Sequence, residues 1–342
     1  MSRVPIIILN WNGLSDTAEC MRSLSHLDKD KYEVILVDNG SSRQEQAELK
    51  KLYEDSTLIT LVFNKENKGF TRGNADIVED ILKRFNLPEF IALLNNDTVI
   101  HPDWIDELIL CAEEHKGDII SSKMINYFDR RVIDNLGHFM LNTGEILPLG
   151  HKQLHQKYTE VFENLGACGG AVLYRVSMLQ EIGFFDRYFD TGYEDAELGL
   201  RGKLLGYKCI LCPEAIVYHK VSQSIKKIRN NRYLQQIQRN IFYTYIKLMP
   251  NRFLLFNSMF LLMKYLMWFF FGLFSFQWHL IRLHSVALIG FIREDLPLAL
   301  ASRKDFYDTY DSAILYQKSF MRPTSFFALT DLRRILIKLS AD

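Results

Sequence analysis

The sequence lacks several features that would assign it to a class at once. Lysine plus arginine and aspartate plus glutamate each number 41 among 342 residues, so the overall charge does not favour nucleic acid as a partner. After the first apolar run, Asn10 to Leu14 lacks the GxGxxG loop of a dinucleotide-binding dehydrogenase. That run, Val4 to Leu9, leaves no room before it for a signal peptide, and we therefore expect a cytoplasmic catalytic portion.

Cysteine is scarce and irregularly placed. The five cysteines are an odd number without the spacing of a disulfide framework, which favours a reduced, cytosolic setting. Cys209 and Cys212 have CxxC spacing, but no second pair completes a zinc site, and they fall in a strand-like run before Pro213. We therefore expect no metal at this pair.

What the sequence does contain is a regular alternation of apolar runs and helical patterns. Strands are expected at residues 4–9, 32–37, 58–63, 90–94, 119–124, 167–174, 207–211 and 215–218. Helices are expected around 18–27, 47–52 and 75–85, from 101 onward, and at 176–182 and 196–205. This order predicts an α/β fold with a doubly wound, mostly parallel sheet flanked by helices.

Several of these strands run straight into loops rich in Asn, Asp and Gly. Such loops follow the first four strands, at 10–13, 38–42, 64–74 and 95–98. Because the carboxyl ends of parallel strands meet at one edge of a sheet, where open α/β sheets bind ligands, these polar groups are expected to converge. The pattern therefore predicts a binding site at this edge.

The segment Phe90 to Ile100, FIALLNNDTVI, carries the strongest candidate for chemistry. Asp97 follows a buried strand with amide neighbours and no basic residue beside it, which suits a hard divalent cation that also holds phosphate oxygens. The alternative is a turn with an Asx cap before the helix that begins near His101. The segment alone fits both.

A second acidic candidate precedes the helix at 196–205. Glu194 and Asp195 stand at its start, where acidic residues are often only partners of the helix dipole. Here they follow an aromatic-rich stretch able to wall off a pocket. The last strand then delivers His219.

Five segments in this order resemble the family 2 glycosyltransferases with the A-type nucleotide-sugar-binding (GT-A) fold. They are ILNWNG at 8–13, VDNGSS at 37–42, NKGFTRGN at 67–74, LLNNDT at 93–98 and GYEDAELGLR at 192–201. The match spans residues 4 to 222 and looks most like rhamnosyltransferase-type enzymes of bacterial surface-polysaccharide assembly, such as O-antigen. It implies a GT-A catalytic domain over 1–222. The implied enzyme is an inverting, metal-dependent hexosyltransferase that moves sugar from dTDP-rhamnose or a UDP-sugar to a lipid-linked glycan.

The resemblance also implies roles for residues at the nucleotide. Asp38 matches the acid that contacts the base or the ribose, and Asn10 and Asn12 lie in the loop that lines the same base. The remaining residues expected near the nucleotide and its diphosphate are Gly69, Arg72, Asn74 and Asn96.

Further roles concern the cation and the reaction. Asp97 is similar to the final acid of the family's Asp-x-Asp motif, which carries Mg²⁺ or Mn²⁺ on the diphosphate. Asn95 replaces the first acid, so one fewer anionic ligand predicts a weaker metal site. Asp195 aligns with the general base, and Glu194 is its usual neighbour. His219 matches a position that approaches the metal in several relatives; the alternative is a structural histidine.

The remainder, residues 223–342, is expected to be a helical, membrane-associating or oligomerising region. A basic run (Lys226 to Arg232) and an amphipathic helix (Tyr233 to Met249) precede Phe253 to Phe276, which is apolar enough to span a membrane. Lys264 near its middle favours a helical pair lying in the membrane interface instead, and packing against protein is the third option. We expect peripheral attachment to the inner face of the plasma membrane, close to a polyprenyl-diphosphate-linked acceptor. The section from Ser302 to Asp342 is expected to be helical.

Two other functions compete with sugar transfer. A metal-dependent nucleotidyltransferase would use the same fold, but it wants a basic, Gly-rich loop after the first strand, and residues 10–15 hold no Lys or Arg. A non-catalytic polysaccharide-assembly subunit would have a decayed site, whereas Asp38, Asp97 and Asp195 are all present. A homodimer through the apolar C-terminal region is a further expectation, independent of which function holds.

Overall fold

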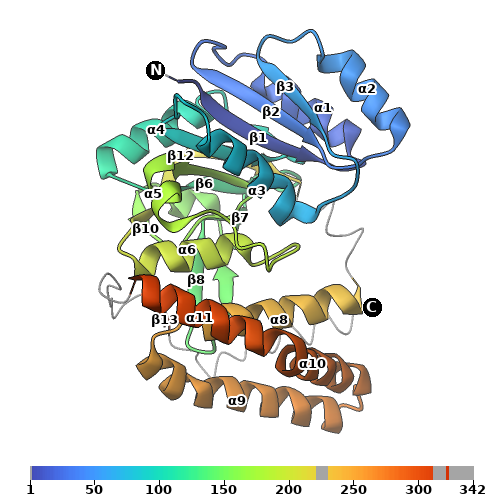
Figure 1. The fold of residues 1–342 in the computed structure, drawn as a ribbon, viewed down its shortest axis with the longest axis vertical. Coiled ribbons are helices and arrows are strands. Elements are labelled where there is room, and N and C mark those ends of the chain that lie inside the picture. The colour runs from blue at the N-terminus through green and yellow to red at the C-terminus, as the bar shows by residue number, and fades with distance from the viewer. Residues whose placement is uncertain (1, 221–229, 311–320, 323–342) are drawn as a thin grey trace.

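The computed structural model describes residues 2–220, 230–310 and 321–322, in which helices cover both faces of a large mixed sheet (Figure 1). The sheet strands are β1 (Val4–Asn10), β2 (Tyr32–Asp38), β3 (Ile59–Phe63), β4 (Phe90–Asn95), β6 (Ile119–Asn126), β10 (Phe162–Glu163), β11 (Ala171–Arg175) and β12 (Cys209–His219). Two short strands, β5 (Thr98–Ile100) and β7 (Ile133–Asn135), pair with β12 and β6. A separate small sheet contains β8 (His138–Leu141), β9 (Ile146–Pro148) and β13 (Met321–Arg322).

The main sheet has the strand order β10-β12-β6-β11-β4-β1-β2-β3. The pairs β4–β1, β1–β2, β2–β3 and β6–β12 are parallel. Strand β11 is antiparallel to both of its neighbours, β4 and β6, and β10 is antiparallel to β12. The predicted doubly wound, mostly parallel sheet is therefore confirmed, with one antiparallel strand inserted at its centre.

Alternating side chains of the central strands build the two cores. On β1, Ile6 and Ile8 face the core under the first helical layer, while Ile7 faces the opposite core. The helices of the first layer are α1 (Leu14–Leu24), α2 (Arg43–Tyr53) and α4 (Trp104–His115); those of the second are α3 (Gly69–Leu82), α5 (Val176–Ile182) and α6 (Glu194–Leu204). A 3₁₀ turn, η1 (His155–Lys157), lies in the loop between β9 and β10.

Several element boundaries differ from expectation, and the strand expected from residue 167 begins only at Ala171, after Gly169 and Gly170. Helix α3 begins at Gly69 and not near residue 75: the side chain of Asn67 accepts a hydrogen bond from the Gly69 N–H (2.8 Å), and Asp190 O accepts one from Thr71 (3.2 Å). These contacts start the helix inside a segment whose glycines suggested a loop. The two strands expected at 207–211 and 215–218 form a single strand, β12, with an irregularity in pairing between Cys212 and Ile216.

The C-terminal helices stack below the sheet domain in Figure 1. They are α8 (Asn231–Leu248), α9 (Asn251–Phe274), α10 (Trp278–Gly290), the π-helical turn η2 (Phe291–Asp295) and α11 (Leu296–Tyr310). Residues 321–322 form a strand against β8, so the helix expected from Ser302 onward is wrong there. The basic run at 226–229 and the domain boundary after residue 222 lie outside the described residues.

A buried ionic cluster joins α8 to α6. Glu197, which is fully buried, accepts hydrogen bonds from Arg201 (2.8 Å from Nη2 and 3.0 Å from Nε) and from Lys247 Nζ on α8 (2.8 Å). Lys247 also contacts Asp186 at 2.6 Å. Burial by itself would raise the pKa of Glu197, but Arg201 and Lys247 together hold it below its ordinary value. The cluster therefore fixes the helix that begins at Glu194 and Asp195.

We expect Glu197→Gln to destabilise the fold by about 3–5 kcal/mol, because it leaves two buried cations facing a neutral amide. Urea denaturation of both proteins at pH 7 measures the difference. Since the folded-state pKa of Glu197 is lowered, the carboxylate stabilises the fold above the ordinary glutamate pKa of 4.5, and this stabilisation is lost as the pH falls below that value. The difference between the two proteins should shrink accordingly.

The matched control is Glu54→Gln, which removes the acid of another i,i+4 pair on a helix. The Lys50 and Glu54 side chains are 66% and 47% exposed and 3.8 Å apart, so the change should cost less than about 0.5 kcal/mol. Equal effects of the two substitutions would contradict a special role for the buried cluster.

Candidate active site

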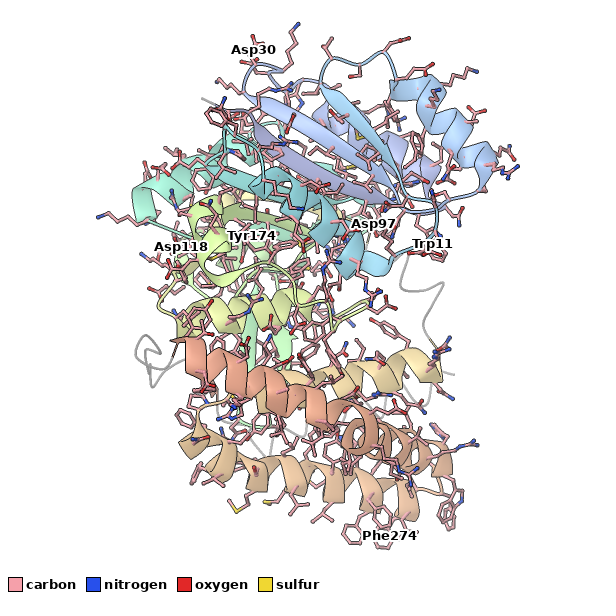
Figure 2. The ribbon with its side chains drawn as sticks, viewed as in Figure 1. Trp11, Asp30, Asp97, Asp118, Tyr174 and Phe274 are labelled. Carbon is pink, nitrogen blue, oxygen red and sulfur yellow. The ribbon has the colours of Figure 1, made fainter. Side chains whose placement is uncertain are left out.

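The carboxyl ends of three neighbouring strands carry the polar residues singled out from the sequence. Asn10 at the end of β1 stands beside Asp38 at the end of β2, and Leu9 stands beside Asn95 at the end of β4. Asp97 follows in the turn between β4 and β5, on the flank of the sheet where Figure 2 labels it near Trp11. The predicted convergence of these strand ends at one edge is therefore present in the structure.

Hydrogen bonds join these strand ends into one buried network. Asn10 donates through Nδ2 to Asp38 Oδ1 and to Glu45 Oε1, both at 2.9 Å. Thr17 donates to Asn10 Oδ1 at 2.7 Å, and Asn96 donates to Thr17 Oγ1 at 2.9 Å. Asn10 and Asn96 thus connect the Asp38 side of the edge to the Asp97 side.

Asp38 is only 1% exposed, and its oxygens accept three protein hydrogen bonds. The donors are Asn10 Nδ2, Ser41 N (3.0 Å) and Gln46 Nε2 (2.7 Å). An ionised carboxylate has room for about four hydrogen bonds, so one acceptor position is left for a ligand. A second would become free if Gln46 moved away. The role of Asp38 at a nucleotide base stays a prediction.

Asn12 shapes the same loop through its backbone. It has a left-handed conformation (φ 46°), which asparagine tolerates, and its side-chain oxygen accepts a hydrogen bond from Ser42 N at 3.1 Å. Its own N–H donates to Ser41 Oγ at 2.9 Å. These contacts hold the loop after β1 against the start of α2.

His219 lies beside Asp97 because β12 runs antiparallel to β5, which pairs His219 with Thr98. The His219 Nε2 atom is 3.2 Å from Asp97 Oδ1, and Nδ1 is 2.7 Å from Asp134 Oδ2. Burial by itself would lower the pKa of His219, but its hydrogen bond to Asp134 and the contact with Asp97 raise it to about 10. In the metal-free protein the imidazole is therefore a cation between two carboxylates.

The same arrangement fits a divalent cation. Nε2 of His219 is buried and faces Asp97 Oδ1, while Asp134 holds the opposite ring nitrogen, as carboxylates commonly do for metal-bound histidines. Within the described residues no group of three or more His, Cys, Asp or Glu side chains could hold a metal. A cation held by Asp97 and His219 would therefore need oxygen ligands from a bound molecule, which a diphosphate supplies.

The alternative of an Asx cap at this segment is not supported. Helix α4 begins only at Trp104, its N-cap residue Asp103 makes no side-chain cap, and β5 separates Asp97 from it. In the turn itself, Thr98 donates to Asn95 O at 2.6 Å.

Asp195, although about 100 residues away from Asn95 in the sequence, is connected to the same end of β4. Its Oδ2 accepts a hydrogen bond from Gly169 N at 2.8 Å, and Gly170 O accepts one from Asn95 N at 2.8 Å. A Cβ at Gly169 would lie 3.3 Å from the Phe70 ring, which is tight, and 3.6 Å from Asp195 Cβ, which is an ordinary contact, so the Phe70 ring is what favours glycine here. Two consecutive glycines thus link Asp195 to the strand that delivers Asp97.

Glu194 and Asp195 have different environments. Glu194 is 4% exposed and its Oε2 has no hydrogen-bond partner, whereas Asp195 is partly exposed. Burial, with a smaller contribution from the negative charge of Asp195, raises the pKa of Glu194 to about 8. At neutral pH Glu194 therefore favours its protonated form, and Asp195 is the more accessible of the two acids.

The three residues expected from the 67–74 segment are separated by the first turns of α3. Asn74 is buried and donates to the Phe70 carbonyl of its own helix (2.9 Å), and Gly69 (φ 75°) abuts Asp190. The side chain of Arg72 is exposed. Of the three, Arg72 is the one whose side chain is exposed, and the roles of all three at a diphosphate stay predictions.

Asp134 is the residue that the sequence did not reveal. It lies on β7, in the stretch 126–150 that has no clear period, and only the pairing of β7 with β6 brings it to His219. The side chains of the CxxC pair lie apart, because Cys209 and Cys212 point into cores on opposite faces of β12. They share no metal position.

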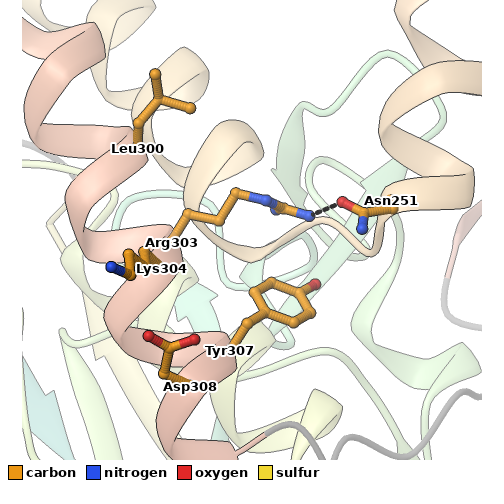
Figure 3. Close-up of a pocket in the computed structure, with 6 residues that line it drawn as sticks. All are labelled: Asn251, Leu300, Arg303, Lys304, Tyr307 and Asp308. Carbon is orange, nitrogen blue, oxygen red and sulfur yellow. Dashed lines mark hydrogen bonds between the residues drawn. The ribbon is translucent and has the colours of Figure 1, made fainter.

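A cavity of about 600 Å³ lies elsewhere, among the C-terminal helices (Figure 3). Arg303 at its wall donates to the carbonyls of Ile246 (2.8 Å) and Met249 (2.7 Å) and to Asn251 Oδ1 (2.6 Å). These bonds terminate α8, so the arginine is structural and does not identify a ligand site.

Comparison with known protein families agrees with this geometry. The model of a family described as "Glycosyl transferase family 2" matches residues 6–183. The "O-antigen biosynthesis protein RfbC" of Myxococcus xanthus is 26% identical over 201 residues, which are 56% of this chain and 15% of that protein. The "Bifunctional glycosyltransferase pgtA" of Dictyostelium discoideum is 25% identical over 131 residues, 37% of this chain and 17% of that protein. The chain thus spans less than a fifth of these curated relatives.

Solved structures share the fold at low sequence identity. GalNAc-T7 with UDP, GalNAc and Mn²⁺ superposes with a TM-score of 0.56 at 14% identity, covering 72% of this chain and 50% of that one. The mannosyltransferase PcManGT from Pyrobaculum calidifontis, in complex with GDP-Man and Mn²⁺, gives 0.51 at 14% identity, covering 99% and 81%. Their likeness supports the fold assignment.

Proposed function

This chain belongs to the glycosyl transferase family 2, and on that basis we propose that it transfers a sugar from a nucleotide-diphosphate donor to a hydroxyl of a growing cell-surface glycan. The observation that carries the proposal is the meeting of two sets of residues at one strand end. Asp97 and His219 lie 3.2 Å apart there, and Asp195 is linked to it through Gly169 and Gly170.

The residues divide the work according to where charge develops. Asp97 and His219 would hold Mg²⁺ or Mn²⁺, with Asp134 fixing the imidazole. When bound, the cation would act as a Lewis acid that stabilises negative charge on the departing diphosphate. The solved neighbours that contain Mn²⁺ and nucleotides support this assignment.

Asp195 acts on the acceptor. It takes the proton of the incoming hydroxyl as that oxygen bonds to the anomeric carbon and the bond from that carbon to the diphosphate breaks. Protonated Glu194 beside it does not compete for this proton. With one base and no second ionised carboxylate acting as nucleophile, the transfer is a single displacement that inverts the anomeric centre.

The donor and acceptor follow from chemistry and from the relatives. dTDP-rhamnose and UDP-sugars are the proposed donors, bound along the edge from Asp38 to Asp97. The O-antigen relative supports a surface-glycan acceptor, which we propose is carried on a polyprenyl diphosphate at the cytoplasmic side of the membrane.

Thermal unfolding with a panel of nucleotide sugars tests the donor assignment. One donor should raise the melting temperature in the presence of Mn²⁺ or Mg²⁺ and not with chelator, because a ligand at about 100 times its Kd adds about 2.7 kcal/mol to stability. The matching nucleoside monophosphate is the control. A panel without any metal-dependent shift would contradict the proposal.

A further inference from the structure

Helix α9 lies at the outer margin of the molecule, on the side away from the sheet domain (Figure 1). Leu255, Met259, Leu262 and Leu266 recur every three or four residues, so they form one stripe, and they are 46–79% exposed. The stretch Phe253–Phe274 has a mean hydropathy of 1.6, enough in length and composition to cross a membrane, yet only 6% of it is buried in the protein. Phe274 lies at the margin of the molecule farthest from β2 and β3 (Figure 2).

The opposite face of α9 holds its polar groups and packs on the protein. Lys264 Nζ lies 2.7 Å from Glu145 Oε1, and the Tyr265 hydroxyl donates to Gln238 on α8 at 2.9 Å. Asn257 is 3% exposed. Crossing a bilayer would carry Lys264 and Asn257 into hydrocarbon, which is unfavourable for a charged and for an amide side chain. These contacts hold the inner face of α9 on the protein along its length, and they leave its outer stripe free to lie along a membrane surface.

The turn between α9 and α10 adds exposed aromatic side chains. Phe274, Phe276 and Trp278 are 77%, 79% and 58% exposed. Phe276 has a left-handed backbone (φ 56°), a conformation that is unfavourable for a residue other than glycine. Aromatic residues are enriched where a membrane meets water, because one part of the ring system is apolar and another tolerates hydration.

Charge is segregated in the same part of the chain. Residues 221–293 contain ten Lys or Arg and no Asp or Glu, although the whole chain has 41 of each class. Three of these cations are paired inside the protein: Arg239 with Glu294 and Asp295, Lys247 with Glu197 and Asp186, and Lys264 with Glu145. Arg232, Arg282 and Arg293 are exposed. The region that carries the apolar face is therefore positively charged.

We propose that α9 docks this chain on an anionic lipid bilayer, lying in the plane of the interface with its outer stripe at the boundary of headgroups and acyl chains. Anionic headgroups attract the cations of the acid-free segment, while the apolar stripe leaves water. A second copy of the chain would bring the same excess of cations in residues 221–293, and this repulsion favours lipid as the occupant.

Flotation of the full-length protein with vesicles tests the proposal. Vesicles of phosphatidylcholine alone are compared with vesicles that also contain phosphatidylglycerol. The informative variant is Leu255→Gln with Leu262→Gln and Leu266→Gln. The matched control, Leu52→Gln with Phe85→Gln and Leu110→Gln, removes three equally exposed apolar side chains from the sheet domain.

We expect the native protein and the control to float with anionic vesicles, more weakly at high ionic strength, and the α9 variant to bind about tenfold less or weaker still. Absence of flotation by the native protein overturns the proposal. So does an α9 variant that floats like the native protein. A dimer in light scattering that the α9 variant abolishes, without vesicle binding, assigns the face to a second copy instead. Flotation measures vesicle binding alone, so neither its success nor its failure tests whether the chain transfers a sugar.

Discussion

Asp195→Asn is expected to lower the rate of sugar transfer by about 10²–10⁴-fold, the usual contribution of a positioned general base. The amide keeps the shape of the side chain and an oxygen to accept the Gly169 N–H, which is 2.8 Å away in the native protein. What it loses is the ability to take the acceptor proton, together with the hydrogen bond that Asp195 Oδ1 accepts from Ala196 N at 2.7 Å. Donor binding should therefore change by no more than a few-fold, and the comparison is kcat against the Kd of the donor.

Glu194→Gln is the matched comparison for this variant, because its carboxyl is the sequence neighbour and is already protonated at neutral pH. It should reduce the rate far less than the change at Asp195. Near-normal turnover by Asp195→Asn would remove that residue from its role. A loss of donor binding as large as the loss of rate would instead indicate a structural defect.

Asp97→Asn should weaken Mn²⁺ binding in the presence of nucleotide by about 100-fold or more, because it removes the one carboxylate proposed to ligate the cation directly. It also removes one of the two carboxylates that face His219. Electron paramagnetic resonance of free Mn²⁺ during titration measures this loss without depending on turnover. An unchanged Mn²⁺ titration would contradict the assignment.

Asp134→Asn gives the graded comparison. Asp134 contacts only the far nitrogen of His219, at 2.7 Å, so its replacement should weaken Mn²⁺ binding by about 10–100-fold. If Asp134→Asn weakened Mn²⁺ binding more than Asp97→Asn did, the proposal that Asp97 contacts the cation directly would be contradicted.

The sequence allowed the sheet and part of the site to be predicted for a specific reason. Parallel strands place their carboxyl ends together, so Asn10, Asp38 and Asp97 could be assigned to one edge from strand order alone. The contact of His219 with Asp97 depends on β12 turning back along β5. No local periodicity encodes that pairing, and the match to a family was needed to suggest it.

Other features depended on contacts between distant segments. Asp134 lies in an aperiodic stretch, and the early start of α3 depends on Asn67 and Asp190. The burial that distinguishes Glu194 from Asp195 also could not be read from a pair of adjacent acids. For α9 the composition predicted an apolar helix, but only the contact of Lys264 with Glu145 showed which of its faces packs inward.

The pairing of β12 with β5 limits where this chain can be cut and joined to a segment of one of its longer relatives. The family match ends at residue 183, before Asp195 on α6 and His219 on β12. A chimera joined at that point would replace Asp195, the proposed base, and His219 by residues of another protein. The turn that contains Asp97 would then lie beside a foreign strand in place of β12. The smallest transplantable unit therefore runs through His219.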